Sequence, residues 1–179
     1  MPTRLLAGLL TLSLFLAACS GTSSEDLQGK FPSSTKVAVS LATSTSSPSG
    51  ARSVSASDDI LLVDATASAA MLLTAGKTFT FTLVTTDPII DTSAAAGVKV
   101  TLKNGSKTIG EGYTTILDAS TVTATITVTS ALSLNTTAKT LTVNTDTASI
   151  LAERAGVDDE VTASLTYGSN TATGNLLRY

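Results

Sequence analysis

The stretch TFTFTLV, Thr78–Val84, alternates large apolar side chains with threonines. A period of two residues places Phe79, Phe81 and Leu83 on one face of a β-strand and the threonines on the other face. Threonine, valine and phenylalanine are all residue types that favour strands. We therefore expect a half-buried strand whose phenylalanines belong to the core.

Other parts of the chain repeat this pattern. TVTATITV, Thr121–Val128, sets four apolar residues against four threonines. VKVTLKNGSKTIGEG, Val98–Gly112, holds Asn104-Gly105 between two runs, and both residues accept the positive φ that a tight hairpin needs. Further apolar or alternating runs of strand length are Thr35–Ala42, Ile60–Val63, Ala69–Leu73, Lys139–Val143, Glu160–Tyr167 and Thr171–Tyr179.

Around eight strands with a turn every eight to twelve residues predict an all-β fold, a single β-sandwich of about seven to nine strands. One short helix is expected at Asp146–Gly156, with Asp146 as its N-cap and Gly156 as its stop. The composition agrees, because only 14% of the residues are charged and 4% aromatic. Threonine, serine, alanine and valine take their place, and two of these are β-branched.

The same composition excludes several classes of function. A net charge of −3 with 11 basic residues leaves no basic face for nucleic acid. The absence of histidine removes the usual general base and the commonest transition-metal ligand. Carboxylates for glycoside cleavage would have to come from Asp87, Asp91, Glu111 and Asp118, but the chain has no tryptophan and only three tyrosines to stack on a sugar. We expect no enzyme.

The lone cysteine, Cys19, lies where an apolar run gives way to small polar residues. Arg4 supplies a positive n-region, Leu5–Leu16 an apolar h-region, and two alanines follow, which is the layout of an export leader. As a helix, about a dozen residues rise roughly 18 Å, too little to span a hydrocarbon core of ~30 Å. A single cysteine also excludes an intrachain disulfide.

LAAC, Leu16–Cys19, resembles the bacterial lipobox, a leucine three residues before a cysteine with small residues between. The resemblance implies cleavage between Ala18 and Cys19, a diacylglycerol on the Cys19 thiol, and a further chain such as palmitate on its amine. Two or three chains anchor a protein firmly. Ser20 is not the aspartate that retains such proteins in the inner membrane, so the resemblance implies the outer membrane or the cell surface. The alternative is an ordinary secretory signal that carries a cysteine.

The expected organisation has three parts. Residues 1–18 are the lipoprotein signal peptide, residues 19–59 the lipidated cysteine with a Ser/Gly-rich tether, and residues 60–179 the β-sandwich domain. The strand Thr35–Ala42 lies within the tether. It is either the first strand of the sandwich or a separate strand able to pair with a neighbour's sheet edge.

The C-terminal stretch Lys139–Tyr179 is similar to the closing half of immunoglobulin-like repeats in large bacterial surface and S-layer-type proteins. Those repeats often end in a strand with a glycine and an aromatic terminus, as Gly174 and Tyr179 provide here. AGKTFTFTLVTTD and VKVTLKNGSKTIGEG are similar in style to the early strands of such domains. The resemblance implies a structural or adhesive surface role and transfers no site.

Three functions are therefore carried forward. The first is a non-catalytic, lipid-anchored envelope protein whose partners are the membrane, through its lipid, and envelope proteins or polysaccharide. The second is a subunit similar to lipoprotein pilins that assemble by strand exchange after proteolysis, for which Arg52 is a candidate cleavage point. The third is a calcium-dependent carbohydrate-binding module, with Asp158, Asp159 and Glu160 as candidate ligands and solvated turn acids as the alternative. No other cofactor is expected.

Overall fold

The computed structural model describes residues 36–44, 59–152, 159–174 and 177–178, and from Val37 onward they form one compact unit. The predicted all-β fold with one short helix is confirmed in these residues. The elements are β1 (Val39–Thr43), β2 (Asp59–Ala67), β3 (Met71–Leu73), β4 (Thr78–Thr85), β5 (Lys99–Asn104), β6 (Lys107–Asp118), β7 (Thr121–Val128), β8 (Leu132–Leu134), β9 (Lys139–Thr145), α2 (Thr147–Ile150), β10 (Glu160–Tyr167), β11 (Asn170–Thr173) and β12 (Leu177–Arg178).

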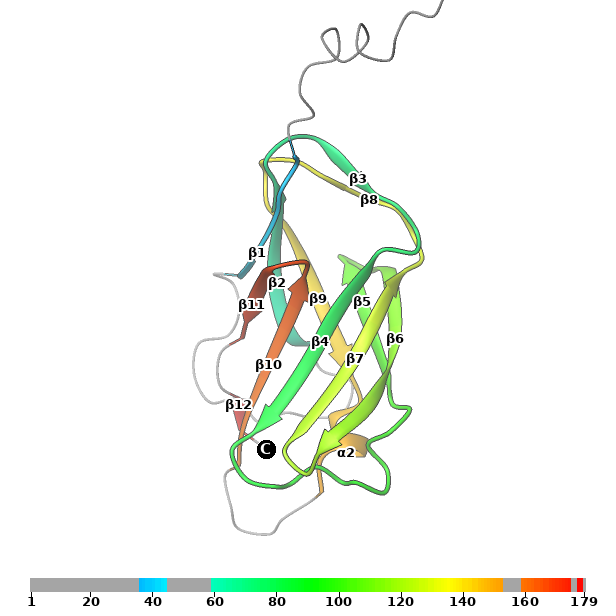
Figure 1. Ribbon diagram of the computed structural model, residues 1–179, viewed down its shortest axis with the longest axis vertical. Coiled ribbons are helices and arrows are strands. Elements are labelled where there is room, and N and C mark those ends of the chain that lie inside the picture. Colours follow the sequence, from blue (N-terminus) through cyan, green and yellow to red (C-terminus); the bar gives the residue numbers. More distant parts are fainter. Residues whose placement is uncertain (1–35, 45–58, 153–158, 175–176, 179) are drawn as a thin grey trace, which may run out of the picture. The chain divides into compact units, whose positions relative to one another are not determined.

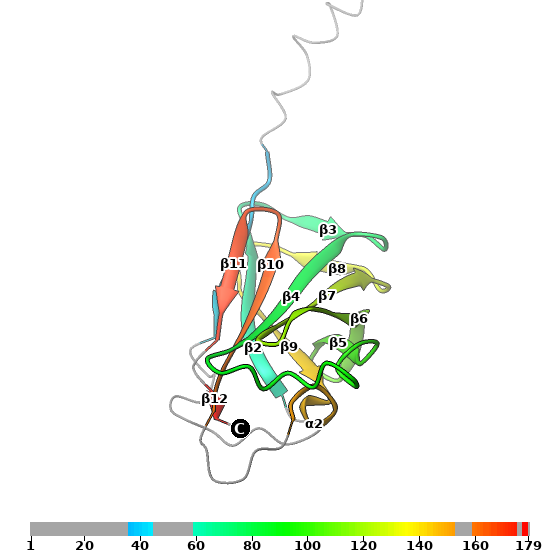
Figure 2. The same ribbon diagram turned by 60° about the horizontal axis from the view of Figure 1, so that its bottom comes forward.

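Most of these strands belong to one large antiparallel sheet, in the order β1-β2-β9-β5-β6-β7-β4-β10-β11, with β12 paired to β10. The sheet curls until its first and last strands, β1 and β11, lie beside each other, which nearly closes it (Figure 1). β2, β9 and β5 therefore lie behind β10, β4 and β7 (Figure 1). The two layers of the predicted sandwich are thus two halves of one sheet. The short pair β3 and β8 lies at one end of it (Figure 2).

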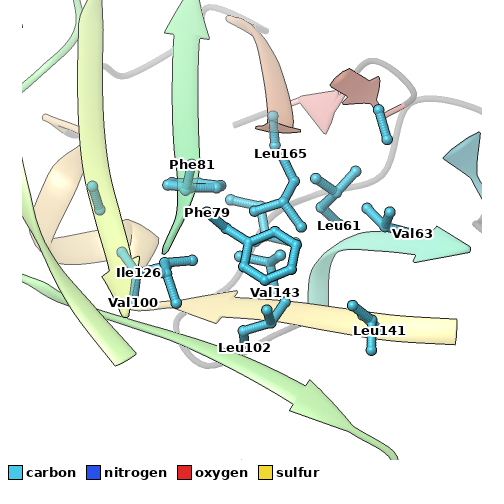
Figure 3. Packing of buried hydrophobic residues seen from close by; sticks show 14 of the residues in the cluster. Leu61, Val63, Phe79, Phe81, Val100, Leu102, Ile126, Leu141, Val143 and Leu165 are labelled. Carbon is cyan, nitrogen blue, oxygen red and sulfur yellow. The ribbon is translucent and has the colours of Figure 1, made fainter. Parts of the chain in front are cut away.

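The core fills the space between the two halves (Figure 3). Phe79 and Phe81 of β4 are 1% and 0% exposed, and Figure 3 shows Phe79 in one cluster with Leu102 of β5 and Val143 of β9. The ring of Phe79 also meets that of Tyr167, with centroids 4.9 Å apart. The inward direction predicted for Phe79, Phe81 and Leu83 is confirmed.

The predicted hairpin between β5 and β6 is confirmed, but its two-residue turn is Gly105-Ser106, one position later than the predicted Asn104-Gly105. Asn104 is paired with Lys107 across the turn, and Gly105 has φ +58°. A side chain at that φ is strained, so a glycine is favoured there.

The strand predicted at Thr35–Ala42 is present as β1, and it completes the sheet of its own chain. It pairs antiparallel with β2, from Val39 opposite Ala67 to Thr43 opposite Val63. Val39 and Leu41 are buried, as the predicted alternation requires. The large sheet therefore begins before the boundary at residue 60 that the composition suggested.

The described residues hold more strands than the seven to nine expected. The apolar run Ala69–Leu73 contains β3, whose partner β8 was not predicted. The C-terminal run Thr171–Tyr179 is divided between β11 and β12, which both pair with β10.

The predicted helix is correct at its start and wrong in its length. Asp146 is the N-cap, and its carboxylate accepts a hydrogen bond from the Ser149 N–H. The helix α2 ends at Ile150, because Leu151 turns to extended backbone and pairs with Ile90 as an isolated bridge. The expected stop, Gly156, lies outside the described residues.

Candidate functional site

The predicted site residues fall into two groups. Cys19 and Ala18 of the lipobox, the candidate cleavage point Arg52, and Asp158 lie outside the residues that the structure describes. The roles assigned to them stay predictions. Asp159 and Glu160 are described and lie at the start of β10.

Asp159 and Glu160 have different surroundings. Asp159 is 1% exposed, and neither of its carboxylate oxygens has a hydrogen-bond partner among the residues that the structure describes. Glu160 is half-buried and is the first residue of β10. Successive side chains of a strand point to opposite faces, so the side chain of Glu160 points away from that of Asp159. Within the described ranges, no group of three or more histidine, cysteine or acidic side chains is close enough to hold a metal ion. The predicted calcium site would therefore need ligands from outside these ranges.

Three of the four carboxylates considered for glycoside cleavage, Asp91, Glu111 and Asp118, have local structural contacts. Asp118 accepts a hydrogen bond from the N–H of Ser120 at 2.7 Å, inside the turn from β6 to β7. Glu111 forms an ion pair with Lys99 at 2.8 Å. The hydrogen bond that the Lys99 ammonium donates to Glu111 is the main cause that raises the pKa of Lys99 above its ordinary value. Because both side chains are exposed, this pair contributes little to stability.

Asp91 organises the loop between β4 and β5. Its Oδ1 accepts hydrogen bonds from the Ser93 hydroxyl at 2.5 Å and from the Ser93 N–H at 2.9 Å. These two hydrogen bonds hold the pKa of Asp91 below its ordinary value. The bond from the Ser93 hydroxyl has the larger effect, and the bond from the Ser93 N–H comes second. These contacts show that the Asp91 carboxylate stabilises a turn in this loop.

A Ser93→Ala chain should therefore show a higher pKa for Asp91, closer to the ordinary value. A carboxyl whose folded pKa is lowered stabilises the native state above its unfolded pKa, and this contribution is lost as the pH falls through the folded pKa. The substitution should reduce that contribution. Carbon-detected NMR titration of the side-chain carboxyl of Asp91 measures it, with the other carboxyl signals as the control. An unchanged Asp91 titration would contradict the assigned cause.

The outer side of β4 and β7 carries threonines in register. Thr78 lies opposite Thr127, Thr80 opposite Thr125, and Thr82 opposite Thr123. The rows continue onto β10 and β11, where the hydroxyls of Thr166 and Thr171 are 2.8 Å apart. This outward direction of the threonines was predicted from the alternation.

Two large apolar side chains on β6 border these threonines. Tyr113 is 60% and Leu117 63% exposed, and both lie on the outer side of the strand next to β7. They were not predicted to lie on the outer side, although their spacing of four residues puts them on one face of a strand. We call the threonine rows of β4 and β7, together with Tyr113 and Leu117, the contact face.

The seam between β1 and β11 is a second feature of interest. Asn170 of β11 donates a side-chain hydrogen bond to the carbonyl oxygen of Val39, and Thr43 donates its hydroxyl to the carbonyl oxygen of Thr173. Among the described residues, no strand pairing joins β1 to β11. β1 is thus held by backbone hydrogen bonds on its β2 side and by side-chain donors on its β11 side.

No protein-family model matches the chain, and no curated protein or solved structure matches it either. In the described part of the chain, no helix has the length and the apolar character needed to cross a membrane.

Proposed function

We propose that this chain is a lipid-anchored protein of the bacterial cell envelope that acts by contact, in a structural or adhesive role. The observation that carries the proposal is LAAC at Leu16–Cys19, placed directly after an apolar leader of about a dozen residues. The lipid attached to Cys19 holds the domain at a membrane, and the domain presents its outer side to neighbouring envelope components.

The contact face supports the second half of this proposal. Threonine presents a hydroxyl and a methyl group without charge, so it can hydrogen-bond to polysaccharide or protein while leaving no unpaired ion. Tyrosine is enriched in protein interfaces, where its ring and hydroxyl are both used. Tyr113 and Leu117 are therefore the residues of this face from which we expect the largest share of binding energy.

A Cys19→Ser chain tests the anchor in cells. Oxygen in place of sulfur leaves no thiol for the diacylglycerol, so the chain should lose lipid-dependent cleavage and leave the detergent-soluble lipoprotein fraction. A Ser20→Ala chain keeps the thiol and should behave as the parent. Fractionation followed by immunoblotting measures both. A Cys19→Ser chain that is still processed and still sediments with the lipid would contradict the proposal.

The seam favours strand exchange as a second candidate function. β1 is a five-residue strand whose apolar residues Val39 and Leu41 fill the gap between β2 and β11. If cleavage at Arg52 released β1, the edge of β2 would present unpaired backbone groups and the core beneath it would meet water. An exposed edge of that kind accepts a strand from another molecule.

Cleavage by an arginine-specific protease, followed by size-exclusion chromatography, separates the two candidates. Strand exchange predicts a ladder of oligomers from the parent chain after cleavage and none from an Arg52→Gln chain. A cleaved parent chain that stays monomeric, with β1 still bound, would favour a plain tethered domain.

A further inference from the structure

The charges of the domain are divided between the two ends of the large sheet. Lys103 and Lys107 flank the turn from β5 to β6. Lys139 begins β9 at the same end, because Leu141 of β9 pairs with Asn104 of β5. We call Lys77, Lys103, Lys107 and Lys139 the lysine end.

Lys77 belongs to this end through the register of two further strands. It precedes β4 in a turn whose Gly76 N–H donates to the carbonyl oxygen of Val128 at 2.9 Å. Val128 in turn pairs with Gly110, three residues after the start of β6. β3, β8 and the turn from β10 to β11, which lie at this end (Figure 1), contain no charged residue.

The opposite end of the sheet is acidic. α2 and the loop between β4 and β5 lie together there (Figure 2), and they bring Asp146 and Asp91 to it. The residues of this acidic end, at strand termini, in the loop and beside α2, are Asp59, Asp87, Asp91, Asp118, Asp146, Asp159 and Glu160. Two described basic residues also lie at this end: Lys99, which forms an ion pair with Glu111, and Arg178 of β12, which is paired with Glu160.

The chain enters the domain at the lysine end. Ala38 donates its N–H to the Ser68 hydroxyl at 2.9 Å, and Ser68 donates its own N–H to the Ala38 carbonyl oxygen at 2.9 Å. Ser68 follows the last residue of β2, so β1 starts beside β3 (Figure 1). The segment that leads back to Cys19 therefore leaves from this end, and its reach is at most about 60 Å.

We propose that the lysine end docks on the anionic phospholipid headgroups of the leaflet that holds Cys19. This inference rests on the lipid anchor of the proposed function. A lysine is attracted to an anionic lipid surface, and the attraction falls off within a Debye length of ~8 Å at physiological ionic strength. The acidic end is repelled by the same surface, so both ends favour one orientation. The tether keeps the domain close to the surface, which raises its effective concentration there.

One carboxylate offsets part of this charge. Asp64 lies in the half of β2 nearer the lysine end and accepts a hydrogen bond from the Thr140 hydroxyl at 2.7 Å. None of the four lysines of this end forms an ion pair with a described acidic residue, because the ion pair between Lys99 and Glu111 involves none of them. The end therefore keeps a net positive charge.

Lysine labelling of the mature lipoprotein in vesicles tests the inference. The protein is reconstituted in phosphatidylcholine alone or with about 30% phosphatidylglycerol, and an amine-acylating reagent is added outside. Docking should lower the labelling of all four lysines of the lysine end. On anionic vesicles we expect about three-fold less labelling, or lower still, than on vesicles of phosphatidylcholine alone. High salt should reverse the effect. Lys99 is the internal control and should be labelled equally on both.

A paired variant sharpens the result. Lys103→Glu with Lys107→Glu should restore the labelling of Lys77 and Lys139 on anionic vesicles, whereas Lys103→Arg with Lys107→Arg, which keeps both charges, should not. A chain that floats with both kinds of vesicle but shows equal labelling would overturn this inference alone. A chain that fails to float with phosphatidylcholine vesicles would overturn the anchor, and the inference with it.

Discussion

A Phe81→Ala chain should lose about 3–5 kcal/mol of its free energy of unfolding. Phe81 is fully buried in β4 between the two halves of the sheet (Figure 3). Removal of the Phe81 ring would leave a cavity that its close-packed neighbours fill only in part. The chain has four phenylalanines and no tryptophan, so few large side chains share the burial. This loss is a large part of the stability of a typical domain.

The neighbouring residue supplies a matched control. Thr80 lies on the other face of the same strand, exposed and opposite Thr125, so Thr80→Ala should change the stability by about 0.5 kcal/mol or less. A Phe81→Leu chain should lie between the two. Urea denaturation of the three chains measures the differences from the midpoints. A Phe81→Ala chain as stable as Thr80→Ala would contradict the assigned core.

A Gly112→Ala chain should be destabilised by about 3 kcal/mol or more, because two strands approach too closely for a side chain. Gly112 is buried on the inner side of β6. An added Cβ would lie 2.3 Å from the carbonyl oxygen and 2.8 Å from the carbonyl carbon of Thr125 in β7. Backbone atoms cannot rotate away as a side chain can, so β6 and β7 would have to separate.

Gly105→Ala separates this clash from ordinary glycine effects. Gly105 has φ +58° and open space around its Cα, so an alanine there is strained by roughly 1–2 kcal/mol and meets no atom. Thermal unfolding of both chains should therefore give a clearly lower midpoint for Gly112→Ala. Equal midpoints, or a milder effect at Gly112, would contradict the close approach of β6 and β7.

The sequence was sufficient to predict the strands but not their partners. The alternation in Thr78–Val84 and Thr121–Val128 shows which residues face the core, and Asn104-Gly105 specifies one turn. Alternation carries no information about which distant strands pair, such as β2 with β9. The near closure of the sheet therefore could not be predicted, since it depends on β1 meeting β11.

The candidate surfaces show the same limit. The outward threonines were predicted, because they depend on local alternation alone. Tyr113 and Leu117 were missed because β6 continues to Asp118, past the point where its alternation becomes hard to follow. The lysine end was not visible either, because Lys77 and Lys139 are far apart in sequence and come to the same end of the sheet only through four successive strand pairings.

The most direct test of the lipid anchor is the mass of the mature N-terminus. The protein is extracted from the membranes of its host in detergent and its N-terminal peptide is measured by mass spectrometry. The account predicts a chain that begins at Cys19 and carries a diacylglycerol on sulfur, with or without an acyl chain on the amine. A mature chain with an unmodified Cys19, or one cleaved at another residue, would contradict it.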